Sequence, residues 1–174
     1  MIRSWNIPSS ALVLALVFPA FAGGPVQAGQ KQIVQSGAWR AIEAERSGRK
    51  VCFVISEPTS RMPADLKRDP GSFFVTLTSS SQGGGTEASI DFGFPLAATG
   101  HVAAVDDRGF ALMSRGETAW LRSEADEAAV VQAMRAGNEM RVTAKSRRGN
   151  TTTDVYSLKG FTAAFAELQK RCRR

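Results

Sequence analysis

Histidine and cysteine, two residue types that often carry catalytic or metal chemistry, are scarce among the 174 residues. The sequence has one histidine, His101, which excludes any site built from several histidines and leaves one imidazole as a candidate base. No Gly-x-Ser-x-Gly elbow occurs, and Gly83-Gly84-Gly85 is not followed by the lysine that a phosphate-binding loop requires. We therefore predict that the protein is not an enzyme and has no catalytic residue, metal site or cofactor.

Long apolar runs are also scarce, and the clearest one lies near the N-terminus. Residues 11–18 are apolar throughout, but they are too few to span a bilayer as a helix. Two small-residue cleavage patterns follow, ending at Ala22 and Ala28, and a proline precedes each. We predict a secretory signal peptide over residues 1–28, cleaved after Ala28 or alternatively after Ala22, with an uncleaved membrane anchor as the other alternative. Residues 29–174 are then one domain without a membrane span, located in the periplasm, secreted or associated with the outer envelope.

Cysteine is limited to Cys52 and Cys172. A catalytic thiol pair would need Cys-x-x-Cys spacing, which is absent, whereas two cysteines in an exported chain favour one structural disulfide. The bridge would close a long loop, and the chain-entropy model gives such a loop about 4 to 5 kcal/mol of stabilisation. We expect this bond to hold the C-terminal segment against an early strand.

Acidic residues are fewer than basic ones, 16 against 22, which gives a net charge of +6. The basic residues lie in small groups near expected turns and ends, which is typical of solvated turns around a globular domain. The alternative is a surface for an anionic glycan, lipid head group or peptidoglycan, and we assign that surface to Arg46, Arg49, Lys50, Arg147 and Arg148. Nucleic acid is not expected as a partner, because the groups lack interleaved aromatic residues.

The remaining sequence reads mostly as short strands. Residues 73–78 alternate large apolar and hydroxyl side chains, which is typical of a half-buried strand. Turn residues separate the segments, as in 106–109 and 146–150. In all we predict about nine strands: 37–42, 50–56, 73–78, 87–92, 102–105, 110–113, 118–121, 139–145 and 151–156.

Two segments have helical patterns. Residues 124–136 follow the N-cap candidate Ser123, carry acids in the first turn and end before Gly137. Residues 161–171 place their apolar side chains at the i, i+3, i+4, i+7 spacing of one buried face. The expected fold is therefore all-β, a β-sandwich with two short peripheral helices.

Several short phrases carry a family resemblance. They are Gly37-Ala38-Trp39, Lys50-Val51-Cys52-Phe53, Gly93-Phe94-Pro95, Arg148-Gly149-Asn150-Thr151 and the closing Ser157-Leu158-Lys159-Gly160-Phe161-Thr162-Ala163. In this order, over nearly all of residues 29–174, the chain resembles the invasion-associated locus B family of exported alphaproteobacterial proteins. The resemblance implies an immunoglobulin-like β-sandwich and supplies no catalytic motif or cofactor.

From these observations we predict an exported, non-enzymatic binding or accessory protein of the periplasm or cell envelope. Its partner would be an envelope or host-surface component, with a contribution to host-cell interaction or invasion as the specific version. Two alternatives stay open: an envelope hydrolase with an unrecognised site, and a purely structural or stress-protective envelope protein. The loops at 57–71 and 79–85 are the expected positions of any functional residues.

Overall fold

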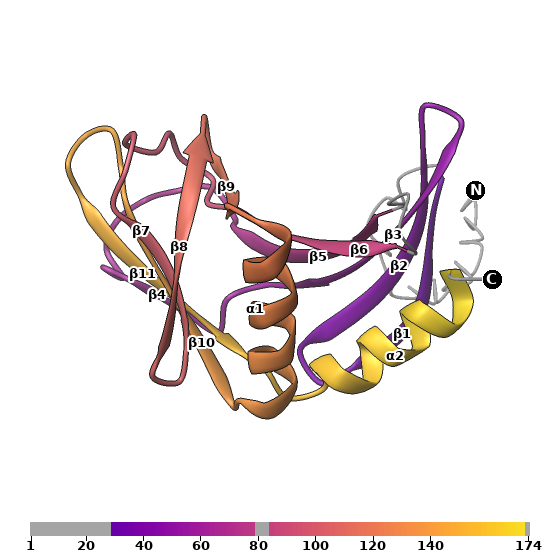
Figure 1. Ribbon diagram of the computed structural model, residues 1–174. Coiled ribbons are helices and arrows are strands. Elements are labelled where there is room, and N and C mark those ends of the chain that lie inside the picture. Colours follow the sequence, from indigo (N-terminus) through magenta and orange to yellow (C-terminus); the bar gives the residue numbers. More distant parts are fainter. Residues whose placement is uncertain (1–28, 79–83, 173–174) are drawn as a thin grey trace, which may run out of the picture.

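We describe residues 29–78 and 84–172 of a computed structural model (Figure 1). The predicted signal peptide with both cleavage sites lies outside the described residues, as does most of the predicted loop at 79–85. No helix within the described ranges is long and apolar enough to cross a membrane. The strands are β1 (Gln30–Ser36), β2 (Trp39–Arg46), β3 (Arg49–Ser56), β4 (Ser60–Met62), β5 (Ser72–Thr78), β6 (Gly85–Asp91), β7 (His101–Val105), β8 (Arg108–Arg115), β9 (Thr118–Leu121), β10 (Glu139–Lys145) and β11 (Thr151–Ser157).

These strands form one antiparallel sheet in the order β1-β2-β3-β5-β6-β9-β8-β7-β10-β11-β4. Figure 1 shows the sheet bent into two halves, with β1, β2, β3, β5 and β6 on one side and β8, β7, β10, β11 and β4 on the other. The halves meet where Trp39 Nε1 donates to the Ser157 carbonyl at 2.9 Å. The Phe73 and Tyr156 rings also pack edge to face, with centroids 5.8 Å apart. The predicted all-β class with two sandwich-like layers is confirmed.

Two of the eleven strands were not among the nine predicted. β1 lies at one edge of the sheet and is largely polar, and its pairing with β2 is interrupted by a register shift between Gln32 and Val34. β4 is a three-residue strand at the other edge, inside the segment 57–71 that was expected to be a loop. Neither strand has the alternating apolar pattern that identifies a strand from sequence. Both lie at an edge of the sheet, have few buried side chains and are strands because they pair with a neighbouring strand.

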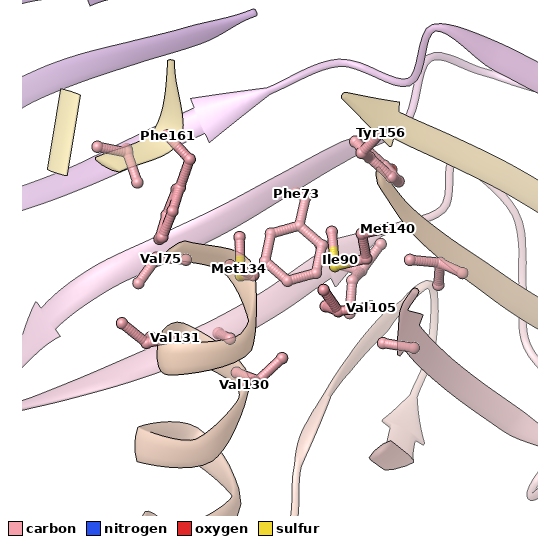
Figure 2. Close-up of a cluster of buried hydrophobic side chains, with 14 of the residues drawn as sticks. Phe73, Val75, Ile90, Val105, Val130, Val131, Met134, Met140, Tyr156 and Phe161 are labelled. Atoms are coloured by element: carbon pink, nitrogen blue, oxygen red, sulfur yellow. The ribbon is translucent and has the colours of Figure 1, made fainter. Parts of the chain in front are cut away.

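Helix α1 (Glu124–Ala136) has the predicted bounds. Its N-cap is Ser123, whose hydroxyl accepts from the Asp126 N–H at 3.2 Å. The helix lies over the inner face of β6 and contributes three of the side chains seen in the core in Figure 2: Val130, Val131 and Met134. Around them lie residues from both halves of the sheet, including Phe73, Ile90, Val105, Met140 and Tyr156, and Phe161 of the C-terminal helix.

Helix α2 (Phe161–Cys172) packs across β1, β2 and β3. Its predicted apolar face is the buried one and consists of Phe161, Ala164, Phe165 and Leu168. Before the helix, Gly160 has φ +95°, and a side chain there would clash with the carbonyl of Ser36, so this position favours glycine. The predicted disulfide is present: Cys52 of β3 is bonded to Cys172 at the end of α2, with their Cα atoms 6.4 Å apart.

Candidate functional site: a basic pocket at the β10–β11 turn

A surface pocket of about 520 Å³ lies where three loop segments meet. Its volume falls within the range of about 300 to 1,000 Å³ that is common for small-ligand sites. The lining residues come from 66–69, from 93–95 and from the β10–β11 turn at 146–150, together with Glu117. We call this the basic pocket. Its position at a meeting of loops, supported by the sheet, is typical of binding sites.

The β10–β11 turn is fixed by hydrogen bonds. The Ser146 N–H donates to the Asn150 carbonyl at 2.8 Å, and the Asn150 N–H donates back to the Ser146 hydroxyl at 3.0 Å. Gly149 has φ +90°, which lets the chain reverse without backbone strain. The Arg147 N–H then donates to the Pro95 carbonyl at 2.9 Å, so the turn is attached to the second wall of the pocket.

The other two walls are held together at Gly93. The Asp69 N–H donates to the Gly93 carbonyl at 3.3 Å, and the Gly93 N–H donates to the Asp91 carboxylate at 3.2 Å. Gly93 has φ +68°, and a side chain on it would clash with the carbonyl of Asp69. This close approach of two backbones is possible only for glycine.

A group of three charged side chains, Arg61, Arg68 and Asp154, adjoins the pocket through Arg68, which also lines it. We call this group the buried ion cluster. Arg68 Nη1 is 2.7 Å from Asp154 Oδ1, and Arg61 Nε is 3.2 Å from Asp154 Oδ2. The Asp154 side chain is 1% exposed and that of Arg68 is 4% exposed. Two guanidinium groups on one carboxylate leave one positive charge in excess.

Arg61 also connects the walls. Its Nη1 donates to the Asp69 carbonyl at 2.7 Å, and its Nη2 donates to the Phe92 carbonyl at 3.0 Å. One side chain therefore holds the carboxylate of β11, the 66–69 segment and the chain leading to 93–95. Such charge-assisted bonds in a partly dry setting make the pocket rigid.

The rim of the basic pocket carries charges without partners. Lys67, Arg147 and Arg148 are exposed and form no ion pair with any residue in the described ranges. Two acids, Asp69 and Glu117, line the same pocket. With Arg68, the lining has four cations against two anions, so the pocket attracts anionic groups.

The five residues of the predicted anionic surface do not lie together. Arg147 and Arg148 line the basic pocket, at the β10–β11 turn in the upper left of Figure 1. Arg46, Arg49 and Lys50 flank the β2–β3 turn in the upper right. The structure thus divides the predicted surface between two separate turns. The sequence could not show this division, because it depends on how the sheet bends.

A second, more open pocket of about 560 Å³ lies beside the β2–β3 turn. Two lysines, Lys31 and Lys50, and two acids, Glu43 and Glu45, line it. Lys50 Nζ is 3.2 Å from Glu43 Oε2, and this hydrogen bond lowers the pKa of Glu43 despite a smaller opposing effect of burial. Lys50 is therefore paired at this turn, whereas Arg46 and Arg49 form no ion pair with any residue in the described ranges and line neither pocket.

His101 is outside the basic pocket and is fixed by the backbone. The side chain is buried on β7, its Nδ1 accepts from the Lys145 N–H at 3.3 Å, and its Nε2 lies 2.9 Å from the Ala97 carbonyl. This pattern assigns the proton to Nε2, which donates to Ala97. Both ring nitrogens are occupied, which supports a structural role.

Potential metal ligands gather at one place in the described part of the chain, where Glu43 lies beside Cys52 and Cys172. The two sulfurs are bonded to each other and are not thiolates, so they do not act as ligands here. Asp106 and Asp107 are adjacent acids that could also be considered as metal ligands. They occupy the β7–β8 turn, where Asp106 has φ +48°. This is the turn role that Asp residues commonly take.

Sequence reasoning missed several residues of the site. Lys67 and Arg68 lie in the 57–71 segment that was expected to hold functional residues, but nothing in the sequence connects them to Arg147 and Arg148. Asp154 reads as a polar residue of a strand, and only its inward orientation on β11 shows that it is a buried counter-ion. The one usable signal in the sequence was that the basic residues of the pocket occur in adjacent pairs, Lys67-Arg68 and Arg147-Arg148, within turn-rich segments.

Comparisons with known proteins agree with the predicted resemblance. The family model described as "Invasion associated locus B (IalB) protein" matches residues 104–169. A crystal structure of invasion associated protein b from Bartonella henselae has a similar fold, with a TM-score of 0.55 and 16% identity, covering 79% of this chain and 94% of that one. No curated protein matches. At this identity the structural match concerns the fold alone, and together with the family model it confirms the predicted resemblance.

Proposed function

We propose that this relative of the invasion-associated locus B proteins is an exported, non-enzymatic binding protein of the cell envelope whose partner is anionic. The partner binds at the basic pocket through Lys67, Arg147 and Arg148. The observation that carries the proposal is the presence of these unpaired cations around a pocket whose walls are held rigid by buried ion pairs. Because the backbone that carries these side chains is already held in place, binding costs little backbone conformational entropy.

Several findings support an extracytoplasmic location. The family that the chain resembles is exported, and the Cys52–Cys172 disulfide is of the kind that persists in oxidising compartments. The predicted signal peptide over residues 1–28, with cleavage after Ala28 or Ala22, accounts for export and leaves residues 29–174 as the binding domain. A role in host-cell contact is the specific version, and it is supported by the name of the Bartonella henselae protein with the similar fold, invasion associated protein b.

Binding to a polyanion tests this proposal. The purified protein is applied to heparin-agarose and to isolated envelope fractions and is released with a salt gradient. We expect Arg147→Ala/Arg148→Ala to elute at lower salt than the unmodified protein, because each lost charge contact reduces the salt-dependent affinity.

The matched control for this experiment is Arg46→Ala/Arg49→Ala, which removes the same number of charges at the other turn. Non-specific attraction to the net charge would lower the elution salt equally for both variants, and that result would refute a role for the basic pocket. Retention that is unchanged in Arg147→Ala/Arg148→Ala would refute it as well.

A hydrolase remains a second candidate for one reason: Asp69 and Glu117 line the same pocket, and paired carboxylates can act as acid and base. Incubating the protein with purified envelope glycans and analysing the products by mass spectrometry distinguishes the two functions. Cleavage that is lost in Asp69→Asn/Glu117→Gln would establish the enzyme. The binding function predicts intact glycans. For a purely structural envelope protein, deletion would weaken the envelope while neither binding nor cleavage is detected.

A further inference from the structure

The composition of the basic pocket defines its ligand more closely. We infer that the pocket binds a short acidic saccharide, whose carboxylate or phosphate contacts the rim cations and whose hydroxyls donate to Asp69 and Glu117. This inference rests on the proposed function and narrows it from an anionic partner to one chemical class. Three properties of the pocket support it: its acids, its apolar wall and its rigidity.

The two acids of the pocket, Asp69 and Glu117, favour an acidic saccharide over more densely charged anions. A densely charged polyanion can also contact the rim cations, but it brings negative charge close to Asp69 and Glu117, and this like-charge contact costs free energy and lowers its affinity. A saccharide with one acidic group per ring brings mainly hydroxyl groups. Hydroxyls donate hydrogen bonds to carboxylates, so the same acids become acceptors for the ligand.

The apolar part of the pocket fits the carbon face of a sugar ring. Phe94, Pro95 and Leu66 contribute apolar surface beside the charged residues. The Phe94 ring is held in place by Phe92, with centroids 5.8 Å apart, and by the Arg68 guanidinium, 5.9 Å from the ring centroid. A mixture of apolar wall and a few placed polar groups is the usual composition of a small-ligand site.

Rigidity supports recognition of a small ligand. Arg61 donates to the Asp69 carbonyl of one wall, to the Phe92 carbonyl next to the second wall and to Asp154. The Arg147 N–H of the third wall donates to the Pro95 carbonyl of the second. The cations and acids that recognise the ligand are thus carried by segments that need little rearrangement. Preorganisation of this kind is what gives small, hydrophilic ligands useful affinity.

The experiment compares three probes by isothermal titration calorimetry: trigalacturonate, the neutral trisaccharide maltotriose, and inorganic phosphate. We expect trigalacturonate to bind about tenfold or more tightly than either of the others, because it alone satisfies both the cations and the acids. Arg147→Ala/Arg148→Ala should weaken trigalacturonate binding about tenfold, and Asp69→Asn/Glu117→Gln should weaken it severalfold. Arg46→Ala/Arg49→Ala should leave it unchanged.

Several outcomes would overturn the inference. Equal binding of phosphate would indicate a simple anion site, and equal binding of maltotriose would indicate that charge is irrelevant. Tighter trigalacturonate binding in Asp69→Asn/Glu117→Gln would show that the acids only repel. If no saccharide binds while heparin retention still depends on Arg147 and Arg148, the saccharide inference fails and the proposed function stands. Loss of that dependence refutes both.

Discussion

The β2–β3 turn and the β10–β11 turn carry the same kind of residue in the same kind of position, yet they differ in what surrounds them. At the β2–β3 turn, Lys50 and Arg171 both approach Glu43, at 3.2 and 3.5 Å. Arg46 and Arg49 of that turn, like Arg147 and Arg148 of the β10–β11 turn, have no ion-pair partner in the described ranges, but Arg147 and Arg148 line the basic pocket and the other two do not. Unpaired charge in a hairpin turn therefore indicates a binding surface only when the fold also places it at a pocket.

The two regions also differ in how they are fixed to the rest of the molecule. Near the β2–β3 turn, β3 is joined covalently to α2 by Cys52–Cys172. Beneath the β10–β11 turn, the buried ion cluster of Arg61, Arg68 and Asp154 connects β11 to the loops. Removing each anchor separately tests whether the two regions are independent.

The disulfide should give the largest effect on stability. Cys52→Ser/Cys172→Ser removes a bond with a sequence separation of 120 residues, and we expect the free energy of unfolding to fall by about 4 to 5 kcal/mol. Urea denaturation followed by tryptophan fluorescence measures it. The basic pocket should keep its ligand affinity below the unfolding transition, because its anchor is intact. A loss of less than about 1 kcal/mol, or a loss of binding in the folded variant, would contradict this independence.

The buried ion cluster should give the next largest effect. Asp154→Asn keeps the shape of the side chain but leaves Arg61 and Arg68 without a counter-charge, which should cost about 3 kcal/mol. This change should also weaken binding at the basic pocket, whereas the disulfide variant should not. Urea denaturation and calorimetric titration measure the two effects.

Tyr156→Phe is the matched control on the same strand. The Tyr156 hydroxyl is buried without a hydrogen-bond partner in the described ranges, and burial, followed by the nearby Asp154 charge, raises its pKa. Removing the hydroxyl should change stability by less than about 1 kcal/mol. If Tyr156→Phe costs as much as Asp154→Asn, packing rather than charge explains the result.

Glu127 on α1 should give a smaller effect than the disulfide or the buried ion cluster, and one that depends on pH. Burial raises the pKa of this carboxyl to about 7, although the hydrogen bond from the Ala88 N–H, at 2.6 Å, partly opposes the shift. The folded protein therefore holds a proton that the unfolded chain, with a pKa near 4.5, releases. The stabilisation is fully present below about pH 4.5 and is lost as the pH rises through about 7, by about 2 to 3 kcal/mol.

The measurement is urea denaturation at pH values between 4 and 8. Glu127→Gln should flatten the profile over this range, while Glu124→Gln, an exposed acid in the first turn of the same helix, should not. Binding at the basic pocket should not follow this profile, because Glu127 is not among its lining residues. A Glu127→Gln profile as steep as that of the unmodified protein would contradict the assignment.

Much of the fold could be predicted because its signals are local. The cap at Ser123 and the stop at Gly137 define α1, and the turn at 146–150 defines the last hairpin. The edge strands β1 and β4 could not be predicted, since their own residues carry no strand pattern and they form only by pairing with a neighbouring strand. The site is likewise non-local: Lys67 and Arg148 line one pocket only because the sheet brings 66–69 beside the β10–β11 turn.

The bond between Cys52 and Cys172 has a consequence for the order of events during synthesis. A chain made from its N-terminus presents the first thiol 120 residues before the second. Throughout that interval Cys52 on β3 is available to other thiols and oxidants, while its native partner does not yet exist. The sequence has no third cysteine, so within one chain the bond can form only after Cys172 has been made, and it then joins β3 to the last helix.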